Sequence, residues 1–427
     1  MQSQLAIPTQ PQERIESIDV LRGVVLLGIL VVNIVAFGLP NAGSISPTSY
    51  GTFEGLDIFA YWVTYFVFEG SQRAVFSMLF GAGIVLFTQR LSTDERGSKV
   101  GTIFTRRMLA LMLFGLVDIF LLLWFGDIIF LYALVGLVVF FFRDTSVRGL
   151  LVASGILFVL LTLYLGAMGS FISFAENRAA TAMEKLEAGG QLSLFDQEML
   201  DTWEEFVAEY EPDASVIQSE VESRQDGYLS AYTAIMPLIL EYQVIGTLVF
   251  SFWDVLLMML VGMALFKLGI LDGSKSYQLY WIMVGVGLGL GLAVNAFEVS
   301  SAIANNYNTM DLQVNWTYNL GRLAVACGLI GVVMLICKAR ILHRTRACLA
   351  AVGRMALTNY LAQSLICLIF FVVLGFFGEL RLHQLFTVVL GIWVIQLVYS
   401  LLWLKRYRFG PLEWLWRYLT YGKVVSK

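Results

Sequence analysis

Four acidic residues interrupt apolar stretches of the chain, where a charge costs several kcal/mol. Asp118 follows Arg107 by eleven residues, which at about 1.5 Å per residue places it about 16 Å from the inner boundary of a membrane helix. No basic residue lies within one helical turn of Asp118, so another helix pairs with it or it carries a proton. We interpret Asp118 as a proton relay, a general base or a substrate contact, or as a structurally paired acid.

Asp127 follows Gly126 at a tight turn, where it serves either as a helix cap or as a second catalytic carboxylate. Asp254 lies in a later apolar segment, about 20 Å from Lys267 by helix rise. It either shares a cavity with Asp118 or is tied to a neighbouring helix. Glu69 is a further catalytic candidate, but its spacing of four residues from a cation favours a structural pair with Arg73.

Basic and amide side chains supply the candidate substrate-binding residues. Arg22 and Arg354 lie near the inner boundary and either bind a phosphate or pyrophosphate or extend to the headgroups, with Asp19 as the i, i+3 partner of Arg22. Three intramembrane amides line a site or join helices, and two of them are one turn apart beside Tyr360 and Ser364. The full binding set is Asp19, Arg22, Asn33, Arg73, Asp254, Arg354, Asn359 and Gln363.

Metal and nucleic-acid chemistry have little support in the sequence. The chain contains two histidines and four cysteines, and the cysteines lie in or beside two apolar segments without CxxC spacing. We therefore expect no metal site, and no bound cofactor. The basic clusters flank apolar segments instead of forming a stripe, so they set membrane topology and do not indicate nucleic acid as a partner.

These residues are positioned by membrane helices. Over 427 residues the mean hydropathy is +0.75 and 58% of residues are hydrophobic, which predicts an all-α polytopic protein in a lipid bilayer. Basic residues gather at alternate loops, so both termini are predicted on the cytoplasmic side. The ten predicted spans are 18–39, 74–90, 106–125, 127–142, 149–173, 245–270, 277–299, 318–338, 350–376 and 383–404.

The spans divide the chain into five parts: a cytoplasmic tail (1–17), a five-helix membrane region (18–173), an insertion (174–244), a second five-helix region (245–404) and a basic cytoplasmic tail (405–427). The insertion is rich in acids, and helical apolar spacing from Leu194 to Val207 predicts a short extracytoplasmic helix, with a solvated linker as the alternative. Segment 57–68 is apolar but too short to span, which indicates an interfacial or partly inserted helix before a polar break at 69–73. No internal repeat is evident.

Several stretches together resemble the bacterial YeiB-like family of inner-membrane proteins of unknown function. They are Asp19 to Asn33, Glu69 to Gly83, Gly126 to Ile128, Gly353 to Ser364 and Gly410 to Gly422. This resemblance covers Arg14 to Lys423 and implies a multi-pass protein of the plasma (inner) membrane. Family members are often described as transporters. The first segment is also similar to membrane acetyltransferases of the heparan-α-glucosaminide type, which implies acyl-CoA as a donor and an acceptor on or across the membrane.

Two departures bear on that implied chemistry. The acetyltransferases use a histidine in the outer loop after the first span, and Asn41–Gly55 contains none. Relatives in the YeiB-like family commonly carry a histidine where this chain has Asp118.

We therefore expect an acyltransferase-related protein that uses acyl-CoA and modifies a small molecule, lipid or glycan outside the cytoplasm. Arg22 and Arg354 would hold the donor phosphates, since arginine matches phosphate oxygens bidentately, while Asp118 and Asp127 line the reaction path. The alternatives are a proton-coupled transporter or exporter and a membrane scaffold or envelope sensor.

Overall fold

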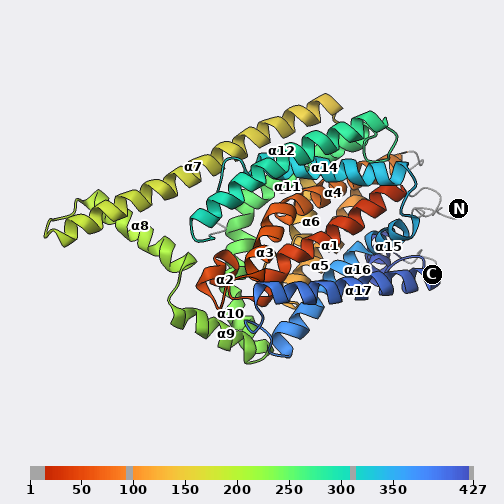
Figure 1. Cartoon of the computed structure of the whole chain (residues 1–427). Coiled ribbons are helices and arrows are strands. Elements are labelled where there is room, and N and C mark those ends of the chain that lie inside the picture. The colour runs from red at the N-terminus through yellow and green to blue at the C-terminus, as the bar shows by residue number, and fades with distance from the viewer. Residues whose placement is uncertain (1–14, 93–99, 308–313, 423–427) are drawn as a thin grey trace.

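The computed structural model describes residues 15–92, 100–307 and 314–422, and within them the regular secondary structure is helical (Figure 1). Leucine, valine, isoleucine and phenylalanine dominate these segments, and a helix satisfies the backbone polar groups that lipid cannot. Eight helices are long and apolar enough to cross a membrane, which confirms a polytopic membrane protein. The first fourteen residues of the predicted N-terminal tail, the loop residues Arg96 and Lys99, and 423–427 lie outside the described residues.

Each of the ten predicted spans overlaps a helix, but the helices over 106–125 and 127–142 are not among the eight described helices that are long and apolar enough to cross a membrane. The helices are α1 (Glu16–Gly38), α4 (Ser71–Ser92), α5 (Val100–Phe120), α6 (Ile129–Val139), α7 (Val147–Glu187), α11 (Phe252–Lys267), α12 (Tyr277–Ala304), α14 (Tyr318–Lys338), α16 (Ala356–Cys367) and α17 (Leu382–Arg406).

Several predicted spans differ from these helices at their ends, and in two of them the helix is interrupted. Residues 121–128 form a turn instead of completing the span 106–125, because Leu123 has a positive φ of 57° and Asp127 binds the first free amides of α6. The predicted span 350–376 begins in α15 (His343–Arg354) and breaks at Met355 before α16. A π-helical turn, η7 (Leu368–Val373), continues α16.

The acidic insertion is built largely from extensions of membrane helices. α7 continues without a break to Glu187, well past the predicted end of its span at 173. The helix predicted from Leu194 is present as α8 (Leu194–Tyr210), and it packs against α7. Next come α9 (Ala214–Gln225) and α10 (Tyr228–Leu240), and α10 joins α11 through the π-helical stretch η6 (Glu241–Ser251). The α7–α8 hairpin projects from the end of the molecule opposite the two chain termini (Figure 1).

Segment 57–68 is helical, as predicted. It forms α3 (Leu56–Val63) and the π-helical turn η3 (Thr64–Phe68), and the chain then breaks at Glu69 and Gly70 before α4. Gly70 has a φ of +65°, and an added Cβ would lie 2.9 Å from the Tyr318 hydroxyl. Glycine is therefore required here on both conformational and steric grounds.

Close helix contacts fix the centre of the bundle. Gly81 on α4 and Gly262 on α11 each lie against the backbone of the other helix: their added Cβ atoms would be 2.1 Å from Met259 O and 1.9 Å from Met78 O. Gly23 and Gly353 join α1 to α15 in the same way. Small residues thus allow the backbone approach that membrane helix pairs use, and the second contact brings the neighbouring residues Arg22 and Arg354 together.

Candidate functional site

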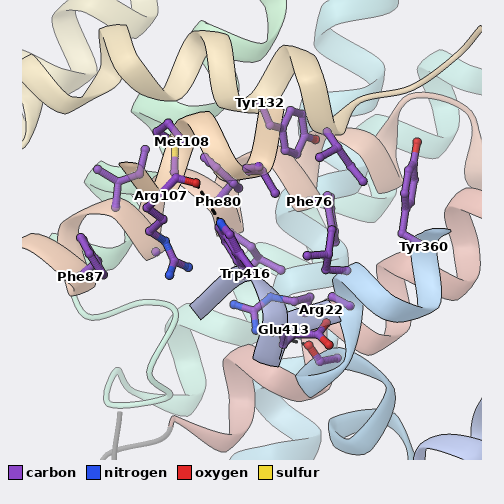
Figure 2. Close-up of a pocket in the computed structure, with 18 of the residues that line it drawn as sticks. Arg22, Phe76, Phe80, Phe87, Arg107, Met108, Tyr132, Tyr360, Glu413 and Trp416 are labelled. Carbon is purple, nitrogen blue, oxygen red and sulfur yellow. Dashed lines mark hydrogen bonds between the residues drawn. The ribbon is translucent and has the colours of Figure 1, made fainter. Parts of the chain in front are cut away.

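A cavity of about 210 Å³ opens beside the α1–α15 contact. Four arginines among the described residues line it: Arg22 on α1, Arg107 on α5, Arg354 on α15, and Arg417 on the C-terminal helix α18 (Pro411–Tyr421). Rings from α4, α5 and α18 form the walls, and Figure 2 shows Phe76, Phe80, Phe87 and Trp416 around this space. The two arginines predicted to bind phosphate therefore share one cavity with two more.

The contacts that the cavity arginines make with other residues do not neutralise the positive charge of the cavity. Arg22 pairs with Asp19 at 3.1 Å, as its spacing predicts, and its Nη1 lies 3.5 Å from the Gly353 carbonyl oxygen. Arg354 donates to the Arg408 carbonyl at 3.5 Å. The Arg107 guanidinium stacks on Trp416 at 3.7 Å, and no carboxylate among the described residues pairs with it. Guanidinium groups held in this way keep donors for an anionic ligand.

Glu413 is the one acidic residue among the described residues that line the cavity. Its carboxylate accepts from the Thr358 amide at 3.1 Å and from the Thr358 hydroxyl at 2.6 Å, which fastens α18 to α16. Burial raises the pKa of Glu413 above its ordinary value, although the Thr358 hydrogen bonds oppose the shift. The acid thus holds the C-terminal helix against the arginines.

Two tyrosines also line the cavity, Tyr132 and Tyr360 (Figure 2). The Tyr360 oxygen accepts from Trp124 Nε1 at 3.1 Å and from the Ile128 amide at 3.3 Å. Both contacts use the oxygen as an acceptor, so the hydroxyl proton is directed elsewhere. Asp118 and Asp127 are among the charged groups close enough to act on this hydroxyl.

Asp118 and Asp127 are neighbours in space, although they lie nine positions apart in the sequence. Asp127 accepts from the amides of Ile129 at 3.0 Å and Phe130 at 2.7 Å, one residue before the N-cap position of α6. Asp118 is completely buried, both its oxygens lack a partner of normal hydrogen-bond geometry among the described residues, and its polar neighbours are Asp127 and Ser364. Adjacent ionised carboxylates repel, so one proton shared between them has the lowest electrostatic cost.

The other predicted acids form a second polar cluster around α14. Asp254 accepts a bidentate pair of hydrogen bonds from Arg322, a residue absent from the sequence prediction, so Asp254 is tied to a neighbouring helix. Glu69 and Arg73 both contact the Tyr318 hydroxyl, at 3.1 and 3.4 Å. Arg73 also lies 3.8 Å from Asp254. The expected i, i+4 relation between Glu69 and Arg73 is thus mediated by Tyr318.

The predicted amides lie outside the cavity lining. Asn359 donates to Ser400 at 3.0 Å and Gln363 to Gln396 at 3.0 Å, so both belong to a polar seam between α16 and α17. Asn33 is half-buried on α1 and makes no side-chain hydrogen bond with a described residue. In the part of the chain that the structure describes, no group of histidine, cysteine and acidic side chains has metal-binding geometry.

The sequence of this chain is similar to those of known bacterial proteins. Residues 265–423 match the family described as "Protein of unknown function (DUF418)". The uncharacterized protein YeiB of Escherichia coli is 30% identical over 97% of this chain and 99% of its own length. The uncharacterized protein YxaH of Bacillus subtilis is 28% identical over 97% of this chain and 96% of its own length. No solved structure matches the chain. On this full-length similarity, the chain belongs to the same family of uncharacterised proteins as YeiB, and its C-terminal part carries the DUF418 match.

Proposed function

We propose that this protein is an acyltransferase-related enzyme of the bacterial plasma (inner) membrane, with acyl-CoA as its donor. The observation that carries the proposal is the convergence of Arg22, Arg107, Arg354 and Arg417 on one cavity that is also lined by Tyr360, a neighbour of the Asp118–Asp127 pair. Clustered guanidinium groups match the phosphates of a nucleotide-bearing donor. The aromatic walls suit the apolar part of the same molecule.

The proposed reaction transfers the acyl group from the thioester to an acceptor hydroxyl of a small molecule, lipid or glycan outside the cytoplasm. The hydroxyl oxygen attacks the thioester carbonyl, a C–O bond forms and the C–S bond breaks. The hydroxyl proton passes to the Asp118–Asp127 pair and from there to the departing thiolate, so an ester and free CoA leave and the carboxyl pair is regenerated. Tyr360, which joins the cavity to the pair, carries the proton between them.

Binding of labelled acetyl-CoA to the full chain in nanodiscs tests the proposal. Arg354→Ala should weaken saturable binding at least tenfold. Arg344→Ala is the matched control, since Arg344 is exposed on the same helix, α15, and does not line the cavity. Absence of binding at millimolar acetyl-CoA by folded wild-type protein would overturn the donor assignment.

The unpartnered Asp118 carboxyl also favours a second candidate, a proton-coupled transporter. In that case Asp118→Asn should stop a pH-dependent flux in reconstituted vesicles, and Arg22→Ala should leave it nearly unchanged. The enzyme hypothesis predicts instead that Arg22→Ala weakens acyl-CoA binding and that Asp118→Asn leaves this binding nearly unchanged.

A further inference from the structure

One face of α4 remains accessible inside the helix bundle. Between Ser71 and Val85 the residues that are not buried are Arg73, Phe76, Phe80 and Gly83. Their spacing of three, four and three residues places them on one side of the helix. The last three line the arginine cavity, and Phe76 and Phe80 point into it in Figure 2. Arg73 is not part of the cavity lining but lies on the same face of the helix, about 15 Å from Gly83 by helix rise.

Contacts of Tyr132 join the cavity wall to Arg73. The Tyr132 hydroxyl lies 2.6 Å from Ser77 Oγ, and Ser77 Oγ donates to the Arg73 carbonyl at 2.9 Å. Tyr132 itself lines the cavity. The Tyr132 hydroxyl also donates directly to the Arg73 carbonyl at 3.4 Å, so one residue of the cavity wall contacts the Arg73 backbone.

Arg73 has more donors than its protein partners use. Its one side-chain hydrogen bond to a described residue, to the Tyr318 hydroxyl, is long at 3.4 Å, and its Nε is buried without a partner. Asp254 is 3.8 Å away, but both its oxygens are taken by Arg322. The Arg73 side chain keeps 37% of its surface accessible, whereas Arg322 keeps 2%. Two arginines near one carboxylate therefore differ: Arg322 is the structural partner and Arg73 has unused donors.

We propose that Arg73 is a deep anion-binding point, which holds a small carboxylate or phosphate group that reaches it along this face of α4. The existence of the Arg73 site does not depend on the proposed function, but the identity of the molecule that carries the anionic group does. If acyl-CoA fills the cavity, the anion is the free carboxylate at the far end of a dicarboxylic acyl chain. If the protein is a transporter, the anion is a free solute.

Thiol reactivity tests the site independently of any turnover. In a full-length background with Cys327, Cys337, Cys348 and Cys367 replaced by alanine, Phe76→Cys serves as the deep reporter and Gly83→Cys as the outer one. A Cβ at Gly83 meets nothing within 4 Å, so that substitution fits. The probes are a sulfonate-bearing and a trimethylammonium-bearing methanethiosulfonate of similar size. Val75→Cys, which is fully buried, is the unreactive control.

We expect the sulfonate reagent to react at Phe76→Cys about tenfold faster than the cationic reagent, because a local positive charge concentrates anions. Arg73→Gln should remove most of that preference at position 76 and leave position 83 unchanged, and Arg73→Lys should retain it. Because Arg73→Lys keeps the charge, it separates loss of the anion site from loss of folding. Equal reaction of both reagents at Phe76→Cys, no reaction there, or a preference that survives Arg73→Gln overturns the site.

Two further arms identify the source of the anion. A carboxylate carried by the donor predicts that succinyl-CoA binds at least tenfold more tightly than acetyl-CoA, and that Arg73→Gln abolishes this difference while acetyl-CoA binding persists. A free solute predicts that succinate or inorganic phosphate alone slows the sulfonate reagent at Phe76→Cys, with Arg73 present and not in Arg73→Gln. If acetyl-CoA does not bind but free anions protect, the donor assignment fails and the Arg73 site stands. If Arg73→Gln changes neither the binding of succinyl-CoA nor the protection by free succinate or phosphate, the Arg73 site is wrong, whatever the outcome for acetyl-CoA.

Discussion

Arg322 and Asp254 form an ion pair with almost no access to solvent, since their side chains keep 2% and 3% of their surface. Asn319, one turn before Arg322, also accepts from this guanidinium. The attraction within such a pair offsets the cost of removing two charges from water, so the pair adds little net stability as a unit. When Arg322 is removed, Asp254 loses both close hydrogen bonds and keeps only Arg73, at 3.8 Å, as a cationic neighbour.

Arg322→Ala should therefore destabilise the protein by about 3–5 kcal/mol, because it leaves Asp254 charged and buried. The double variant Arg322→Met with Asp254→Leu should regain most of that loss. Thermal unfolding in detergent measures both, with the exposed Arg344→Ala as control. A double variant no more stable than the single one would show that the pair is not an isolated unit.

Glu413 gives a pH dependence to the arginine cavity. Because its pKa is raised in the folded state, the protonated Glu413 carboxyl favours folding more than the ionised one does. This stabilisation is fully present below the ordinary pKa of 4.5 and is lost as the pH rises through the folded-state pKa. The ionised carboxyl also opposes a bound anion. Glu413→Gln should then bind acetyl-CoA about three- to tenfold more tightly at neutral pH and lose part of the pH dependence. Binding measured between pH 5 and 8 for both proteins checks this, and parallel curves would refute it.

At the scale of elements, the α4–α11 contact fixes the wall of the cavity. Gly262→Ala would place a methyl group against the Met78 backbone, where only a helix shift can relieve the clash. We expect a loss of about 3 kcal/mol or more. Gly83→Ala on α4 is the matched control, because its Cβ meets nothing within 4 Å. Equal melting temperatures for the two variants would mean that the helices are not in this close contact.

Helices were predictable from the sequence, and most of the partnerships between them were not. Long apolar runs are sufficient to identify membrane helices, and the Asp19–Arg22 pair follows from spacing on one helix. The partner of Asp254 depends on how α11 and α14 pack, which no local pattern encodes. Arg322 itself was a visible signal, since it is a charge inside the predicted span 318–338. Asp118 and Asp127 meet only because the turn at 121–128 is tight, which hydropathy does not report.

At the scale of the whole molecule, the charge bias predicts that α1 begins on the cytoplasmic side, and the α7–α8 hairpin lies at the end of the molecule opposite the start of α1 (Figure 1). Leu194, 93% exposed at the start of α8, should therefore face the outside. In the cysteine-free background, a membrane-impermeant maleimide should label Leu194→Cys on intact cells and Arg344→Cys only after permeabilisation. Labelling of Arg344→Cys on intact cells would reverse the assigned topology.

The length of α7 has a mechanical consequence. Its 41 residues extend about 61 Å, twice the roughly 30 Å of a bilayer core. The outer half is stiffened by α8, whose Asp196 bonds to Lys185 at 2.8 Å. With one half of α7 in the bilayer, we expect the other half to extend about 30 Å beyond the lipid and to keep any rigid layer at that distance. Since the inner half of α7 packs on α11, a sideways load at the tip would be transmitted, as by a lever, to the helix that carries Asp254.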